Sequence, residues 1–134
     1  MKPRNPRITP KDRSLIKGAL RRAFARSALH QEVMNSITVE HSNPKNPRCK
    51  KWGFCQVCKD VLPRWRLVVD HIIPFVKTDT TFEEMSLDEA VDRLWCDKSN
   101  LQSICPTCHK IKSSLEAKER KARRQLKKNV KQIK

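Results

Sequence analysis

Two Cys-x-x-Cys pairs in this sequence have the spacing of metal ligands. Cys55 and Cys58 form the first pair, and Cys105 and Cys108 form the second. A gap of two residues lets both thiolates of a pair face one ion, and two pairs complete the four-sulfur shell of a tetrahedral zinc site. Because four sulfurs leave no open coordination position, the expected zinc ion is structural. The alternative is four unrelated buried or redox-active cysteines.

A second set of polar residues lies between the pairs and directly after them. Asp70 and His71 are adjacent, Asn100 precedes the second pair, and His109 follows Cys108. A nuclease site needs a base for water, a cation that neutralises the scissile phosphate, and a group that holds the base still. These residues offer a candidate for each task. Singly, each also has a structural interpretation: a hydrogen-bonded His and Asp pair, a turn-forming Asn, or a His that replaces a cysteine as zinc ligand.

The surrounding sequence predicts the strands and the helix that would position these residues. Residues 65–73 are rich in β-branched side chains and predict a strand that Pro74 stops. Residues 97–100 predict a turn, residues 101–104 predict a short strand, and Pro106 is suited to the first position of a helix. We expect this last helix to continue as a charged, exposed rod that frays towards the end of the chain.

Two capping boxes predict two further helices. Thr9, Pro10 and Asp12 mark the start of one, which extends to about residue 35 with an apolar side and a basic side. Ser86 and Glu89 mark the start of the other. Its expected buried face consists of Leu87, Ala90, Val91, Leu94 and Trp95. We expect the first helix to dock on the core and to present its basic side to solvent.

Four short motifs carry a resemblance to a known family. They are Lys51-Trp52 before the first cysteine pair, Val69-Asp70-His71-Ile72 followed by Pro74, Asn100-Leu101-Gln102, and Cys105-x-x-Cys108-His109-x-x-Lys112. Together, over about residues 50–120, they resemble the HNH endonuclease family, in particular its small zinc-containing phage and bacterial members. Any one of these motifs alone would be a weak signal.

The resemblance implies a ββα-metal fold, in which a β-hairpin and a helix hold one divalent cation. It assigns His71 as the general base and Asn100 as the residue that holds the hairpin loop in register. It assigns Asp70 and His109 as ligands of the catalytic metal. One carboxylate and one imidazole suit Mg²⁺ or Mn²⁺, which keep waters and bind phosphate oxygens. Some HNH nucleases have a further histidine one helical turn later, where this chain has Ser113.

The expected fold class is α+β: a small ββα-metal core stapled by the four-cysteine zinc site, with an N-terminal amphipathic helix and a basic C-terminal helix. At 134 residues, 37% hydrophobic and 33% charged, the chain fits one domain with a small core. The expected segments are a basic disordered lead (1–8), a basic amphipathic helix and loop (9–48), a nuclease domain with its zinc (49–120) and a basic tail (121–134).

Positive charge gathers at both ends of the chain. Residues 1–51 contain thirteen Lys and Arg against three acids, residues 110–134 contain eleven against two, and residues 52–109 contain six against nine. Basic arms favour nucleic acid, because phosphate neutralisation supplies most sequence-independent affinity. The alternatives are a solvated surface and a polybasic membrane patch, but no basic helix here carries the bulky apolar face that would anchor it in a bilayer.

Five basic residues are the expected contacts with DNA. They are Arg21, Arg22, Lys112, Arg123 and Arg124. For Lys112, an exposed helical lysine without a ligand is the simpler interpretation. Because neither a glycine-rich recognition loop nor a tandem finger repeat is present, we expect low sequence specificity, or specificity supplied by a partner.

These features predict a metal-dependent DNA endonuclease with structural Zn²⁺ and catalytic Mg²⁺ or Mn²⁺. The alternatives are a non-catalytic zinc module that binds nucleic acid and an accessory factor of a phage DNA-packaging assembly. The N-terminus has no apolar run typical of a signal peptide, and no stretch is long enough to span a membrane. We therefore expect a cytoplasmic protein, located in the host cell if it is phage-encoded, whose six cysteines are metal ligands and free thiols.

Overall fold

The computed structural model describes residues 5–133, and its architecture is mixed α+β. The helices are α1 (Pro10–Ala25), α2 (Ala28–Ser36), α3 (Leu87–Leu94) and α4 (Pro106–Ile133). The strands are β1 (Thr38–Val39), β2 (Trp52–Phe54), β3 (Val61–Pro63), β4 (Val68–His71) and β5 (Leu101–Ile104). Of the expected lead, residues 1–4 lie outside the described part, and the Ile8 N–H bonds to the Asn5 carbonyl at 3.1 Å to close a turn.

The strands form two separate antiparallel sheets. Strands β1, β2 and β3 make one sheet in that order, and β4 pairs with β5 in the other. In the second sheet Asp70 lies opposite Gln102, and His71 lies opposite Leu101. Only Cys105 separates β5 from α4. Val68, at the start of β4, therefore lies opposite Ile104, two residues before α4, and α4 then contacts β4, although α3 lies between β4 and β5 in the chain.

The N-terminal helical region consists of two helices, so the single helix expected up to residue 35 is wrong. Its start is as predicted: the Thr9 hydroxyl accepts the Asp12 N–H at 3.1 Å, and the Asp12 carboxylate accepts the Thr9 N–H at 3.0 Å. The break lies at Ser27. Its hydroxyl donates to the Phe24 carbonyl at 2.6 Å and accepts the His30 N–H at 3.2 Å, so this one side chain ends α1 and begins α2.

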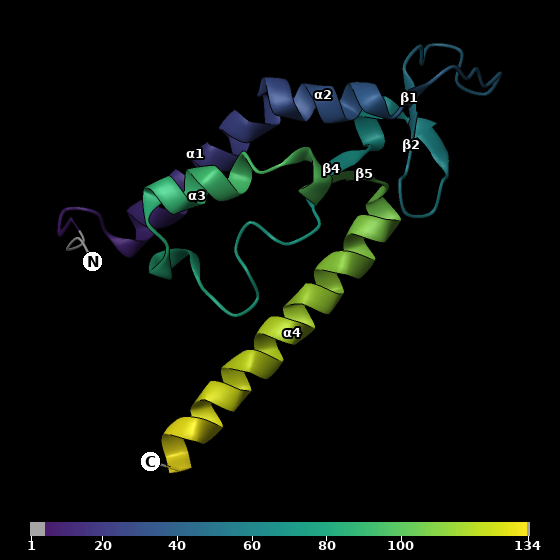
Figure 1. Ribbon diagram of the computed structural model, residues 1–134. Helices are drawn as coiled ribbons and strands as arrows, with labels where there is room; N and C mark the ends of the chain where they lie inside the picture. The colour runs from purple at the N-terminus through teal and green to yellow at the C-terminus, as the bar shows by residue number, and fades with distance from the viewer. Residues whose placement is uncertain (1–4, 134) are drawn as a thin grey trace.

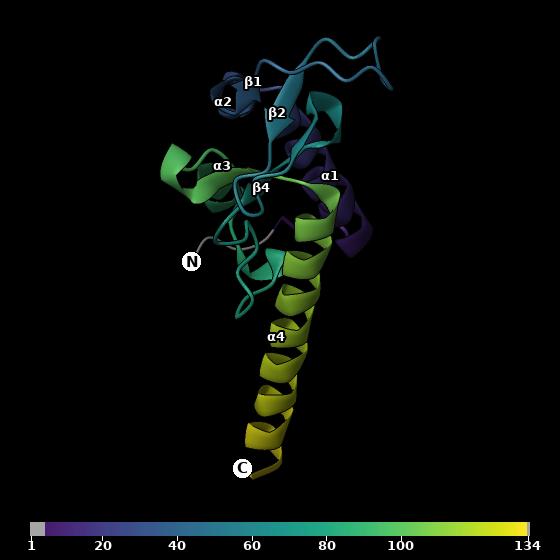
Figure 2. The same cartoon turned by 90° about the vertical axis from the view of Figure 1, so that its right-hand side faces the viewer.

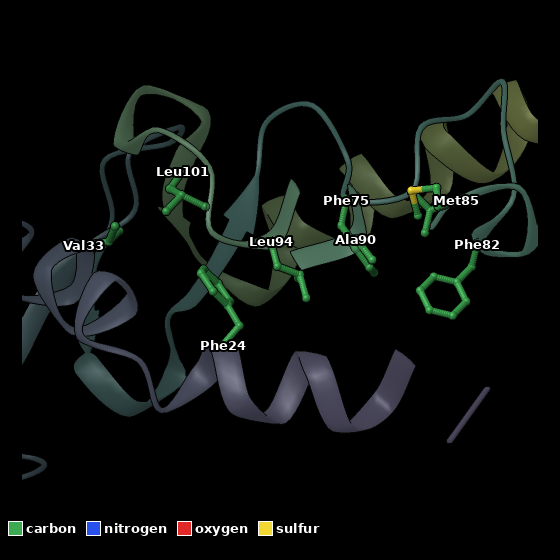
Figure 3. Packing of buried hydrophobic residues seen from close by; sticks show 9 residues of the cluster. Phe24, Val33, Phe75, Phe82, Met85, Ala90, Leu94 and Leu101 are labelled. Atoms are coloured by element: carbon green, nitrogen blue, oxygen red, sulfur yellow. The ribbon is translucent and has the colours of Figure 1, made fainter. Parts of the chain in front are cut away.

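The larger cluster of buried apolar side chains joins α1 and α3 to α2, to β5 and to the segment between β4 and α3 (Figure 3). Phe24 of α1 and Leu94 of α3 lie side by side in it (Figure 3). The buried face of α3 is narrower than expected: Ala90 and Leu94 are buried, but Leu87 and Val91 are exposed because α1 covers one side of α3. A second cluster consists of Met34, Ile37, Cys55, Leu67, Ile104 and Cys105.

The strand expected over residues 65–73 is shorter in the structure. Arg64–Arg66 form a 3₁₀ turn, and only residues 68–71 pair with β5. After His71 the chain leaves the sheet, and the Ile72 N–H donates to the Asn100 carbonyl at 2.8 Å. The sheet therefore ends at the candidate catalytic histidine.

Helix α4 is the longest element and projects away from the rest of the structure (Figure 1, Figure 2). The loop after β4 contacts the middle of this helix. Arg120 donates to the Val76 carbonyl at 2.7 Å, and Thr78 donates to the Glu119 carboxylate at 2.8 Å. Residues 121–133 are exposed, as the charged pattern predicted. Among residues 5–133 no helix combines the length and the apolar character that crossing a membrane requires.

Candidate metal centre and catalytic cavity

The four predicted cysteine ligands come together in the structure. Cys55 directly follows β2, Cys58 lies in the turn before β3, and Cys105 and Cys108 lie at the start of α4. Their sulfur atoms all lie within 4.8 Å of one another. The Cys58 and Cys105 sulfurs are 3.8 Å apart, and a tetrahedron with zinc–sulfur bonds of about 2.3 Å has an edge of about 3.8 Å. The donor set and its spacing fit a structural metal such as zinc.

Two tight turns present these sulfurs. The Cys58 N–H donates to the Cys55 sulfur and the Cys108 N–H donates to the Cys105 sulfur, each at 3.4 Å. In the first turn Lys59 adopts the left-handed conformation, with a φ of 68°, and its N–H donates to the Cys55 carbonyl at 2.9 Å. The backbone of each turn therefore holds the two sulfurs of a pair close together.

Gln56 ties the first turn to strand β5. Its backbone N–H donates to the Ser103 carbonyl at 2.9 Å, and its side-chain oxygen accepts the Ser103 N–H at 2.6 Å. Ser103 is completely buried. These two bonds hold the first cysteine pair against the strand that leads into the second pair.

Hydrogen bonds inside the cluster make the thiols unequally acidic. Burial opposes ionisation of Cys55, but hydrogen bonds from the backbone of Cys58, Cys105 and Val57 lower its pKa to about 6. A hydrogen bond with the Cys105 side chain, together with burial, raises the pKa of Cys108 to about 12. Cys55 is therefore more acidic than Cys58 and Cys108, whose pKa values are raised, and a metal ion that binds there has to displace thiol protons.

Beside the cysteine cluster, Asp70, His71 and His109 line one cavity of about 590 Å³. Strand β4 contributes Asp70 and His71, and α4 contributes His109 from the position after Cys108. Residues of α1 line the same cavity. The structure thus gathers three of the four residues that the sequence singled out for catalysis around one hollow.

The His71 ring is held at one nitrogen. Its Nε2 atom lies 2.9 Å from the Leu94 carbonyl oxygen. Because a carbonyl only accepts hydrogen bonds, Nε2 carries the hydrogen, and in the neutral ring Nδ1 keeps its lone pair. Within residues 5–133, Nδ1 has no hydrogen-bond partner. Phe24 packs against the ring, with 5.1 Å between the centroids. The geometry leaves His71 with one fixed donor and one open acceptor.

Asn100, the fourth residue, holds the chain that leaves β4. Its side-chain oxygen accepts the Ile73 N–H at 2.8 Å, and its amide donates to the Ile73 carbonyl at 3.2 Å. Its backbone carbonyl accepts the Ile72 N–H. These three bonds fix the two residues that directly follow His71.

Lys112 is half-buried in the cavity and differs from the exposed helical lysine that the sequence suggested. Its ammonium lies 3.1 Å from Asp70 Oδ2, donates to the His71 carbonyl at 2.9 Å, and pairs with Glu116. Gln102 donates to the same oxygen of Asp70 at 3.3 Å. The other oxygen, Oδ1, accepts no hydrogen bond from the part of the chain that the structure describes. One side of the Asp70 carboxylate therefore already has a cation, and the other side is open.

Sequence reasoning assigned no role to Gln102 or Glu116. Glu116 lies four residues after Lys112 and seven after His109, a spacing that places all three on one face of a helix. This spacing could have predicted from the sequence that Glu116 lies near the site. The His109 side chain is half-buried and makes no hydrogen bond to any of residues 5–133. Its ring nitrogens are therefore available as ligands.

The other basic residues expected to contact DNA are exposed. Arg21 and Arg22 lie on α1, and Arg21 also lines the cavity. On α4, Arg123 pairs with Glu119 at 3.0 Å, and Arg124 is exposed. Positive charge therefore flanks the cavity from two helices.

The fold and the site define a mixed α+β protein in which a four-cysteine cluster, able to hold a structural metal, lies beside a polar cavity. The chain matches no family model, no curated protein and no solved structure.

Proposed function

We propose that this protein is a metal-dependent DNA endonuclease of the HNH type, with a structural zinc ion beside its catalytic site. The observation that carries the proposal is the contact of His71 Nε2 with the Leu94 carbonyl at 2.9 Å. It leaves Nδ1 as an acceptor in the cavity that Asp70 and His109 also line. A neutral imidazole held in this way is suited to take a proton from water.

Each polar residue has its own task in this hydrolysis. His71 Nδ1 removes a proton from the attacking water, and the Leu94 carbonyl stabilises the imidazolium that forms. Asn100 is a positioning residue, because it holds the segment directly after the base. Asp70 and His109 would hold Mg²⁺ or Mn²⁺, an ion that neutralises charge on the phosphate and on the leaving oxygen. The open Asp70 Oδ1 and the unengaged His109 ring fit that donor set.

The cysteine cluster supports the proposal by fixing where α4 begins. Cys108 and His109 are consecutive residues of a helix, so their side chains project about 100° apart. A metal bound by Cys108 therefore fixes the direction of His109 without sharing a ligand with the catalytic ion.

A non-catalytic zinc module that binds nucleic acid is the second candidate, and Lys112 favours it. The Lys112 ammonium pairs with both Asp70 and Glu116. If it stays there, Asp70 is unable to hold a divalent cation with full effect, and the cavity is a structural ion-pair network. The basic residues of α1 and α4 would still bind phosphates.

Cleavage of supercoiled plasmid separates the two candidates. We expect nicking or linearisation with Mg²⁺ or Mn²⁺ and none with EDTA. His71→Ala should abolish cleavage and leave the zinc content and the circular dichroism unchanged. The matched control is His41→Ala, an exposed histidine outside the cavity, which should cleave like the wild type. A gel shift without cutting under every metal would support the binding module, and full activity in His71→Ala would rule out His71 as the base.

A further inference from the structure

We propose that a second hollow, between α2 and the loop over residues 43–51, binds a single-stranded stretch of DNA, with Trp65 stacking on one base. The hollow has a volume of about 710 Å³. We call it the basic hollow, and the lining residues proposed to contact DNA are Arg48, Lys50, Lys51, Arg64 and Trp65. The identity of the ligand as DNA rests on the proposed nuclease function.

The basic hollow carries several positive charges and has no acidic residue in its lining. Four of the residues that line it are Lys or Arg, and none is Asp or Glu. Arg64 donates to the Asn35 side-chain oxygen at 3.0 Å, and Arg48, Lys50 and Lys51 form no ion pair within residues 5–133. A concave surface with several uncompensated cations attracts a polyanion such as a phosphate backbone.

Trp65 stands at this hollow with its ring in solvent. It is 77% exposed, whereas Trp52 is 3% exposed. The 3₁₀ turn that carries it is anchored, because the Arg64 N–H donates to the Lys51 carbonyl at 3.0 Å and the Leu67 N–H donates to the Arg64 carbonyl at 3.2 Å. No other aromatic ring of the described chain packs against Trp65. An exposed indole on an anchored turn beside cations is suited to stack on a nucleobase.

The basic hollow adjoins the candidate catalytic cavity. Ala25 and His30, on either side of the bend between α1 and α2, line both. The Phe24 ring packs against both His30 and His71, with its centroid 5.8 Å from that of His30 and 5.1 Å from that of His71. A strand that crosses this bend would lead from Trp65 to the candidate base.

Stacking on Trp65 requires a base whose face is free. In a duplex both faces of each base are covered by neighbouring bases, whereas in a single strand a base can splay out onto an aromatic side chain. A duplex would use only the cations of the basic hollow and leave Trp65 without a partner. The arrangement therefore favours a substrate with an unpaired segment next to the cleavage site.

The test measures binding separately from cutting. Full-length His71→Ala protein, without Mg²⁺ or Mn²⁺, is titrated with a labelled oligo-dT strand of about ten nucleotides, a length in the range that single-strand sites accommodate. Tryptophan fluorescence and anisotropy of the label are recorded together. We expect oligo-dT to quench the fluorescence and to bind more tightly than a duplex of equal length.

Three further substitutions in the His71→Ala protein make the test specific. Trp65→Ala should abolish most of the quenching and weaken oligo-dT binding about 10-fold, whereas Trp65→Phe should keep most of the affinity. Arg48→Ala should weaken binding and reduce its dependence on salt. The matched control is Lys45→Ala, an exposed lysine in the same loop that does not line the basic hollow and should bind like its parent.

Several outcomes would overturn the proposal. Equal affinity in Trp65→Ala and its parent, or a preference for the duplex, would remove Trp65 as a stacking platform. Much tighter binding of oligo-rU than of oligo-dT would make RNA the ligand. Tight Trp65-dependent binding in a protein that never cuts plasmid would reject the nuclease and keep the basic hollow. Plasmid cleavage with Trp65-independent binding would reject the basic hollow and keep the nuclease.

Discussion

The Lys112 ammonium lies 3.1 Å from Asp70 Oδ2, so a residue three positions after His109 pairs with the carboxylate proposed to hold the catalytic metal. The same ammonium donates to the backbone carbonyl of His71 at 2.9 Å. Lys112 therefore joins α4 to the end of β4 where the candidate base and the candidate metal ligands meet. In this state a divalent cation has to compete with an ion pair for Asp70.

Replacing Lys112 with methionine should lower the Mg²⁺ concentration that cleavage requires, because no ammonium then competes for Asp70. The protein should also lose about 1–2 kcal/mol of unfolding free energy, because Asp70 and Glu116 lose their shared, partly buried cation. Mg²⁺ titration of plasmid cleavage and urea unfolding measure the two effects. Lys110→Met, an exposed neighbour on α4, is the control. A higher Mg²⁺ requirement in Lys112→Met would show that Lys112 assists the metal.

The purified protein should contain one zinc ion per four-cysteine cluster. Cys105→Ser should lose the zinc and the fold together, because a core this small depends on the metal that joins the start of α4 to the turn after β2. Metal analysis and circular dichroism report the two losses. Cys49→Ser, a cysteine outside the cluster, should keep both. A well-folded wild type without zinc would contradict the structural role.

Asn100→Ala should slow cleavage about 10- to 100-fold, because the segment after His71 loses both side-chain bonds that hold Ile73 and the base loses its alignment. Asn100→Asp keeps the acceptor for the Ile73 N–H and should be less impaired. Amide hydrogen exchange at Ile73 should speed up in the alanine variant while the zinc content stays constant. Faster exchange with unchanged cleavage would separate Asn100 from the alignment of His71.

Stability should depend on pH through His30. Burial, followed by the charge of Arg64, lowers the pKa of His30 in the folded protein. Below about pH 6.5, the ordinary histidine value, the unfolded chain therefore binds a proton that the folded protein does not. The stability that His30 contributes is complete above that pH and is lost as the pH falls through the folded value. His30→Gln should lose less stability than the wild type between about pH 7.5 and about pH 5.5, as measured by urea unfolding, and equal losses would contradict this account.

The elements that the sequence predicted well are those whose signals lie within a few residues. The capping box at Thr9 and the strand over residues 101–104 appear as expected. Of the box predicted at Ser86, the Ser86 hydroxyl accepts the Glu89 N–H, but the Glu89 carboxylate pairs with Arg93 instead of the cap. The Cys-x-x-Cys spacing was equally local, and the four sulfurs are close together. The bend at Ser27 was missed because the apolar pattern of the first helix continues across it and conceals the second cap.

Contacts between distant segments were not predictable in the same way. Strand β1 has two residues and β3 has three, too few for an alternating pattern to register in the sequence, so the three-stranded sheet was not anticipated. The inward position of Lys112 depends on how β4 lies against α4, and no local pattern of α4 encodes that placement. The motifs that contain Asp70, His71 and His109 did predict that these residues lie near one another, and all three line one cavity.

Helix α4 runs without interruption from the cysteine cluster through the cavity to its exposed end. Each residue added to a helix turns everything after it by about 100°. The cysteine cluster therefore fixes the rotation of the helix residues that follow it. One residue inserted between Cys108 and His109 would leave all four sulfurs in place but would turn His109, Lys112 and Glu116 away from the cavity. Residues 128–133 are exposed, so a residue inserted there would leave the cavity unchanged.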